Sequence, residues 1–261
     1  MADNLQTIFR SAENLATLRK LHAELLGSLV TAAKLDQTLP QKLTTFMPRQ
    51  GLLSTGELMI VGRAPNGWRE GWTLQENQSP ERREQTIREL EAEFALPKCP
   101  MAWANEPQPN WNWRRSPFTR LMNQLAEKLP DYSEQTWPSR LIWSNLYKIA
   151  PDKGGNPNNR LCIAQERVCL EYFAAELRIW QPKQVVLVTG WDWAHPFVNR
   201  LDPDASAKPS REQLVDWSGL VHPHPDQAPI PLVVCKRPER RRVANIVQEI
   251  TAAFQKLAQA N

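Results

Sequence analysis

Four short, uninterrupted apolar runs constrain the fold of this chain more than any other feature. They span residues 58–61, 141–144, 185–189 and 232–235. A run without polar alternation is typical of a strand that is buried on both faces, as in a parallel sheet. Helical stretches separate the runs, and an alternation of strand and helix favours a layered α/β architecture. We therefore predict an α/β fold with a central four-stranded, mainly parallel sheet flanked by helices.

Apolar side chains at spacings of three and four residues predict the helices. These segments are 5–35, 80–94, 118–129, 159–179 and 238–258. The first segment precedes the alternation of strand and helix. We therefore predict an N-terminal helical segment, 1–50, packed on an α/β domain, 51–261. His22 in the first helix has no histidine nearby in sequence, so we expect it at a packing interface and not in a metal site.

Composition excludes several classes of protein. No apolar run approaches the ~20 residues that span a membrane, and the N-terminus lacks the basic and apolar regions of a secretory signal. The four cysteines (Cys99, Cys162, Cys169 and Cys235) form no CxxC pair and are expected to be reduced thiols. We expect a cytoplasmic monomer that contacts no membrane and carries no metal or cofactor. Its net charge of +4 is compatible with a nucleic-acid partner.

The residues that follow the predicted strands are the candidate site, because ligands of open parallel sheets bind at the carboxyl ends of the strands. A turn at 62–68 follows the first strand and lacks the Lys of a phosphate-binding P-loop. Asn145 and Lys148 follow the second strand, and a basic stretch, 236–242, follows the fourth. Cations at the start of a helix oppose its dipole, so this stretch favours an anionic partner.

Taken in order, these segments resemble the motifs of the uracil-DNA glycosylase superfamily, and are most similar to those of its thermostable iron–sulfur members. The matching segments are Gly62-Arg63-Ala64-Pro65-Asn66, Pro117-Phe118, Asn145-Leu146-Tyr147-Lys148 with Pro151, Pro182-Lys183 before the third strand, and Arg237-Pro238. The resemblance covers residues 55–255 and implies the fold of that superfamily. It also implies hydrolysis of the N-glycosidic bond of a base flipped out of DNA, which leaves an abasic site.

The resemblance assigns a role to each motif. A flat side chain stacks on the flipped base, a carboxamide reads its edge as donor and acceptor, and amides and cations hold the phosphates. The implied base-binding residues are Arg63, Ala64, Pro65, Phe118 and Asn145. The implied catalytic residues are Asn66, Glu70 and Arg237. The implied contacts to duplex or opened DNA are Gly62, Gly67, Trp68, Arg114, Arg115, Lys148, Lys236, Pro238, Arg240 and Arg241.

This sequence departs from the family at two positions that face the base. Arg63 stands where the iron–sulfur members have an acid, and Arg237 replaces the His of the last motif; the cluster cysteines are also missing. Asn66 or Glu70 is then left to orient the water. A guanidinium with five donors suits a base substituent with several oxygen acceptors, such as a hydroxymethyl or sugar-bearing pyrimidine. Such bases occur in some bacteriophage DNA, which indicates antiviral defence.

Other interpretations stay open. Arg63 facing a phosphate would indicate a repair enzyme for uracil or another deaminated base. The missing acid is also compatible with a catalytically inactive relative that only binds nucleic acid. An α/β enzyme that acts on a nucleotide or another phosphorylated small molecule is a third class. The formation of alkali-labile abasic sites distinguishes a glycosylase from both of these classes.

Overall fold

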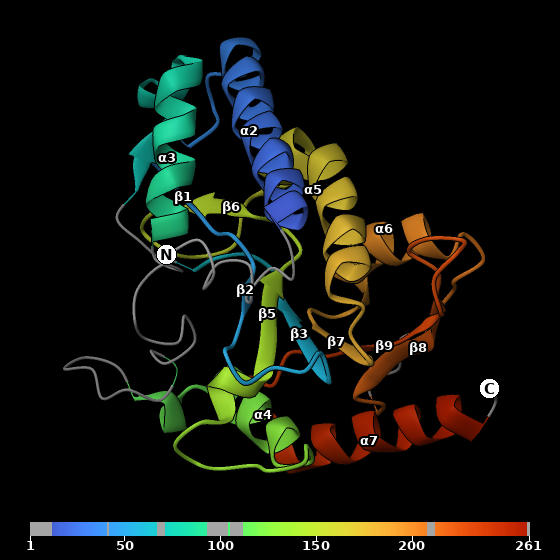
Figure 1. Cartoon of the computed structure of the whole chain (residues 1–261). Coiled ribbons are helices and arrows are strands. Elements are labelled where there is room, and N and C mark those ends of the chain that lie inside the picture. Colours follow the sequence, from blue (N-terminus) through green and yellow to red (C-terminus); the bar gives the residue numbers. More distant parts are fainter. Residues whose placement is uncertain are drawn as a thin grey trace. The chain divides into compact units, whose positions relative to one another are not determined.

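The chain folds into two units, and successive segments of the sequence belong to one unit and then to the other. The computed structural model describes residues 12–40, 42–66, 71–92, 104, 112–207 and 212–259 (Figure 1). The first unit draws on the ranges Met1–Pro48, Arg63–Leu96 and Asn145–Ile179, and the second on Arg49–Gly62, Pro97–Ser144 and Trp180–Asn261. The division into a segment 1–50 and a domain 51–261 stays a prediction.

A six-stranded mixed sheet forms the centre of the second unit. Its order is β2 (Arg49–Gln50), β5 (Leu141–Asn145), β3 (Leu58–Gly62), β7 (Gln184–Val188), β9 (Ile230–Cys235) and β8 (Val215–Val221). The strand β7 runs parallel to both β3 and β9, whereas the outer strands β2 and β8 are antiparallel to their neighbours. The α/β class is thus confirmed. The predicted four-stranded sheet is too small, because its four strands are the inner ones of six.

The outer strands, β2 and β8, could not be predicted from the sequence, for physical reasons. Strand β2 has two residues, too few for any periodicity. Strand β8 contains Asp216, Ser218 and Gly219, and most of its residues are half-buried. It lies at the sheet edge, so it does not need the apolar run of a central strand.

Helices α4 (Pro117–Ala126), α6 (Trp191–Leu201) and α7 (Val243–Gln259) complete the second unit, together with the 3₁₀ turns η3 (Trp113–Arg115) and η4 (Trp137–Arg140). Helix α7 packs on α4, β8 and β9, and α6 packs on β8 and β9. The predicted start of the last helix at residue 238 is wrong. Arg240 has a φ of 62°, in the left-handed region, so the preceding residues form a turn and not a helix.

The first unit combines helices with a small antiparallel sheet. The helices are α2 (Ala12–Leu35), α3 (Pro80–Ala92) and α5 (Asn159–Trp180), with the 3₁₀ turn η1 (Glu76–Gln78). The sheet has the order β4 (Trp72–Thr73), β1 (Lys42–Thr45) and β6 (Ile149–Pro151), and both outer strands run antiparallel to β1. Helix α2 packs on α3 and η1. None of the described helices combines the length and the apolar character needed to cross a membrane.

Candidate functional site

The segments that follow two neighbouring strands are hydrogen-bonded to each other. Strand β3 ends at Gly62 and β5 ends at Asn145, and the two strands are adjacent in the sheet. Just beyond them, the backbone N–H of Tyr147 donates to the carbonyl of Arg63 at 2.9 Å. Residues 63–66 and 145–148 therefore lie side by side within the first unit, and they are two of the motif segments singled out in the sequence.

Asn145 is held by a buried charge. Asn145 is only 3% exposed, and its backbone carbonyl accepts a hydrogen bond from Nζ of Lys148. The Lys148 ammonium lies 2.6 Å from Oε1 of Glu176, and both side chains are fully buried. It also lies 4.9 Å from the centre of the Tyr172 ring.

The predicted phosphate contact of Lys148 is therefore wrong. A lysine with no exposed surface cannot reach DNA, and its charge is compensated inside the protein by Glu176. Lys148 instead fixes the end of β5. Glu176 was missed because carboxylates seldom lie in a buried helix face. The signal was present, since Glu176 interrupts an otherwise apolar stretch of α5 from Tyr172 to Leu177.

Further hydrogen bonds anchor the segment after β5. The Gln165 carboxamide, fully buried on α5, accepts from the backbone N–H of Ile149 at 3.1 Å and donates to the carbonyl of Ile149 at 2.9 Å. The carbonyl of Lys148 accepts from the N–H of Phe46 at 2.9 Å. Helix α5 and strand β1 thus hold this segment from two sides, which gives a rigid base for the Asn145 side chain.

The turn after β3 is tied to a glycine turn. Oδ1 of the exposed Asn66 accepts from the N–H of Gly155 at 2.5 Å. Gly154 and Gly155 have φ values of +89° and +91°, which a residue with a side chain rarely adopts. The second lone pair of Oδ1 and the amide nitrogen of Asn66 remain to orient a water. Arg63 and Ala64 are half-buried and Pro65 is buried. The predicted residues Gly67, Trp68 and Glu70 lie outside the described residues.

The second unit holds the other predicted residues. Phe118 lies half-buried in the first turn of α4, which is capped by the Ser116 hydroxyl accepting from the N–H of Thr119 at 3.2 Å. Arg114 and Arg115 are exposed in η3, and Arg114 is paired with Glu134.

The basic stretch after β9 divides into paired and exposed cations. Nζ of Lys236 donates to the carbonyl of Gln213 at 2.5 Å. Two nitrogens of the Arg237 guanidinium, Nε and Nη2, donate to the Glu239 carboxylate, and Nε lies 3.1 Å from Oε2. Pro238 is buried, while Arg240 and Arg241 are exposed. The pairing of Arg237 was missed, although Glu239 stands only two residues further on; Nη1 of Arg237 takes no part in this pair.

His22 lies at a packing interface, as expected. It is fully buried on α2, with Nε2 at 3.0 Å from Oγ1 of Thr45 and its ring edge-on to Tyr172. Burial, with a smaller contribution from the Lys148 charge, lowers the pKa of His22 from 6.5 to about 3. The ring is therefore neutral in the folded protein at physiological pH.

This depressed pKa predicts an acid-sensitive contribution to stability. Between pH 6.5 and 3 the unfolded chain takes up a proton at His22 that the folded chain does not, so the contribution is complete above pH 6.5 and is lost as the pH falls. We expect His22→Gln to flatten the dependence of the unfolding free energy on pH, by up to ~1.4 kcal/mol per pH unit. Urea unfolding between pH 7 and 4 measures this slope. The exposed His222 supplies the control, and a His22→Gln slope equal to that of His222→Gln would contradict the prediction.

No metal site is evident in the described part of the chain, where no three His, Cys, Asp or Glu side chains converge on a position that could hold an ion. The arrangement that stands out is the pair of strand-end segments with Asn145 and Arg63. No protein-family model matches this sequence, and no curated protein matches it with significance.

Proposed function

We propose that this chain is a monofunctional DNA glycosylase with a fold of the uracil-DNA glycosylase type. The observation that carries the proposal is the hydrogen bond between Tyr147 and Arg63, which joins two motif segments at the ends of neighbouring strands. In open α/β sheets this is where ligands bind. The enzyme would hydrolyse the N-glycosidic bond of a flipped-out base, as a cytoplasmic monomer without metal or cofactor.

The roles follow from the chemistry of the side chains. Asn145 offers both a donor and an acceptor to the base edge, and the rigid segment around it keeps the carboxamide in one orientation. The resemblance assigns to Phe118 the flat surface for stacking. It assigns to the guanidinium of Arg237 the stabilisation of the departing base, which carries negative charge. The turn at 62–68 orients the attacking water, through the Asn66 amide or Glu70.

The substrate we propose is a modified pyrimidine, and the biological role is defence against phages that carry such bases. The support is Arg63, whose donors fit a substituent rich in oxygen acceptors better than they fit uracil. Excision of uracil or another deaminated base is the second candidate, and it applies if Arg63 faces a phosphate.

A panel of DNA duplexes tests the function. Each carries one uracil, one hydroxymethylated pyrimidine or one glucosylated pyrimidine, and abasic sites are scored by alkaline cleavage. We expect cleavage of a modified-pyrimidine duplex. Cleavage of uracil DNA alone would support the repair enzyme. Binding without cleavage of any duplex would indicate an inactive relative, and turnover of free nucleotides without DNA cleavage would indicate the small-molecule enzyme.

The exposed arginines after β9 predict a salt signature. Phosphate contacts release counterions, so each lost contact should reduce the slope of log affinity against log salt by ~0.9 on duplex DNA. We expect the double variant Arg240→Gly, Arg241→Ala to lose about two such contacts; glycine suits the left-handed φ of 62° at residue 240. Fluorescence anisotropy from low to high salt gives the slope. The matched control Lys20→Ala, Lys34→Ala removes two exposed charges from α2, and equal slopes in both double variants would place the DNA elsewhere.

A further inference from the structure

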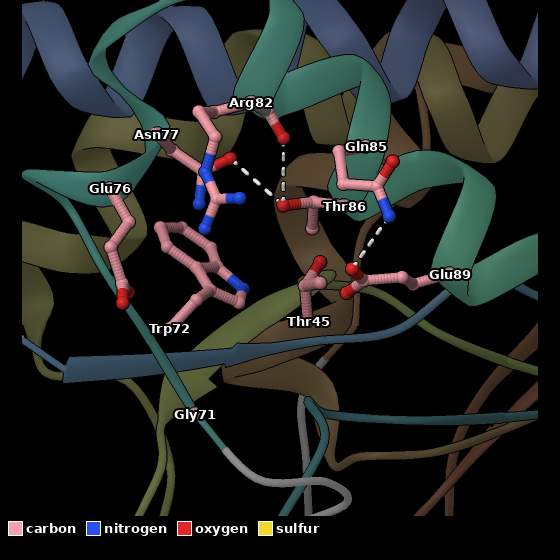
Figure 2. Close-up of a pocket in the computed structure, with 9 residues that line it drawn as sticks. All are labelled: Thr45, Gly71, Trp72, Glu76, Asn77, Arg82, Gln85, Thr86 and Glu89. Atoms are coloured by element: carbon pink, nitrogen blue, oxygen red, sulfur yellow. Dashed lines mark hydrogen bonds between the residues drawn. The ribbon is translucent and has the colours of Figure 1, made fainter.

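A polar pocket lies within the first unit, away from the residues assigned above. Its volume is about 480 Å³, within the range of small-molecule sites, and β4, η1, α3 and the end of β1 form its walls (Figure 2). Trp72 is the only aromatic side chain among the described residues that line it, and nearly all the others are polar or charged. The pocket thus offers one flat apolar surface surrounded by hydrogen-bonding groups.

Two hydrogen-bond donors in the pocket wall have no partner among the residues that the structure describes. The indole Nε1 of Trp72 is buried and makes no hydrogen bond to any of them. Asn77 is only 1% exposed; its Oδ1 accepts from Oγ1 of Thr86 at 3.0 Å, but its amide nitrogen donates to no described residue (Figure 2). A buried donor left without an acceptor costs free energy. A ligand that accepts from the indole removes this cost, and the same ligand can also accept from the Asn77 amide.

Acceptors lie on the same wall. Oε2 of Glu76 is taken by Thr73, whose N–H and hydroxyl lie at 2.5 and 2.9 Å and lower the pKa of this carboxyl, so Glu76 is ionised and its Oε1 remains available. Glu89 binds Nε2 of Gln85 through Oε1, at 2.9 Å, and keeps Oε2 for a ligand. The side chain of Arg82 makes no hydrogen bond to the described residues and points toward the Trp72 ring (Figure 2).

The mixture of groups selects the class of ligand. Two carboxylates against one guanidinium leave the wall negative, which disfavours a phosphate. The unpartnered donors make it a poor metal site. Hydroxyl groups both donate and accept, so a neutral molecule with several hydroxyls satisfies Glu76 and Glu89 as well as Asn77 and the indole. The C–H face of a sugar ring also packs on the flat face of a tryptophan.

We propose that this pocket binds a sugar ring, either as a free saccharide or as a sugar carried on a DNA base. Thr45 lines the pocket, and its Oγ1 lies 3.4 Å from the carbonyl of Lys148. Lys148 in turn donates to the carbonyl of Asn145, so the pocket adjoins the segment after β5. The sugar-on-DNA source rests on the proposed function, whereas binding of a free saccharide does not.

Binding measurements on the full chain test the proposal and separate the two sources. One series titrates glucose, galactose, mannose and their methyl glycosides, followed by tryptophan fluorescence and calorimetry. The other compares DNA duplexes that carry hydroxymethylcytosine with duplexes that carry glucosylated hydroxymethylcytosine. We expect saturable binding of a free sugar, or at least tenfold tighter binding of the glucosylated duplex. Binding of no free sugar, together with equal affinity for the two duplexes, would overturn the proposal.

Variants locate the sugar. Trp72→Leu and Glu89→Gln should each weaken sugar binding at least tenfold, measured as the affinity for the free sugar or as the preference for the glucosylated duplex. Glu89→Gln changes an exposed helix position, so it preserves folding even if Trp72→Leu does not. Arg88→Ala, on the same helix but outside the pocket, is the matched control and should bind as wild type does. Sugar binding unaffected by both pocket variants would overturn the assignment. If the chain binds sugar but forms no abasic sites in any duplex of the panel, the proposed glycosylase activity is contradicted and the assignment of the sugar pocket is not.

Discussion

Replacing Glu176 with glutamine should destabilise the folded chain by about 3–5 kcal/mol, because the variant leaves the Lys148 ammonium buried without a counter-charge. The free energy of unfolding of an ordinary domain is about 5–15 kcal/mol, so this one change removes a large share of the total stability. The same loss is expected for Lys148→Met, which strands the carboxylate. Urea unfolding followed by circular dichroism measures both variants.

Two further variants make this prediction specific to burial. The double variant Lys148→Met, Glu176→Leu removes both charges together and should recover most of the lost stability. Lys183→Met breaks an ion pair with Glu57 at 2.7 Å, but Lys183 is 69% exposed, so this change should cost less than about 1 kcal/mol. If Glu176→Gln and Lys183→Met lost similar free energies, burial of the Lys148–Glu176 pair would not be what makes it costly to remove one partner.

Asn145→Ala should lower the single-turnover rate of base excision by about 10²–10³-fold, the loss that follows removal of one donor to the developing negative charge. This expectation rests on the proposed function. Asn145 ends β5 and its backbone carbonyl is held by Lys148 whatever the side chain, so the alanine variant should still fold. Abasic-site formation with enzyme in excess over the DNA measures the rate.

The matched control removes a carboxamide where no role is expected. Gln255 is exposed on α7, and Gln255→Ala should excise at the wild-type rate. Asn145→Asp adds a second test, since it keeps the shape of the side chain but replaces the donor with an acceptor. An Asn145→Asp variant that folds and excises as fast as Gln255→Ala would show that Asn145 does not read the base.

The inner strands of the sheet could be predicted because they obey one simple rule. β3, β5, β7 and β9 are buried on both faces, so nearly every residue must be apolar. The small sheet of the first unit follows no such rule. Its strands have two to four residues, and one of them begins with the exposed Lys42. Their pairing depends on segments far apart in the chain, which a local pattern does not contain.

The candidate site shows the same division. The expectation that ligands bind at the carboxyl ends of strands drew attention to Arg63 and Asn145, whose segments lie side by side after neighbouring strands. Their role in binding stays a prediction. The sequence did not reveal that Lys148 is buried, because its charge alone indicated an exposed cation, and it did not reveal that Glu239 pairs with Arg237. What decides the environment of a lysine or arginine is the location of its carboxylate, and Glu176 reaches Lys148 only through the packing of α5.

The alternation of the chain between its two units has a consequence for synthesis and truncation. The first unit needs β1 from near the N-terminus and β6 and α5 from beyond residue 144. On the ribosome it cannot close its sheet until most of the polypeptide has emerged, and contacts between such distant segments form slowly. No single cut divides the polypeptide into one fragment per unit. A fragment that begins after residue 50 would lack β1, the partner strand of β6. The backbone N–H and C=O groups of β6 that pair with β1 would then have no hydrogen-bond partner.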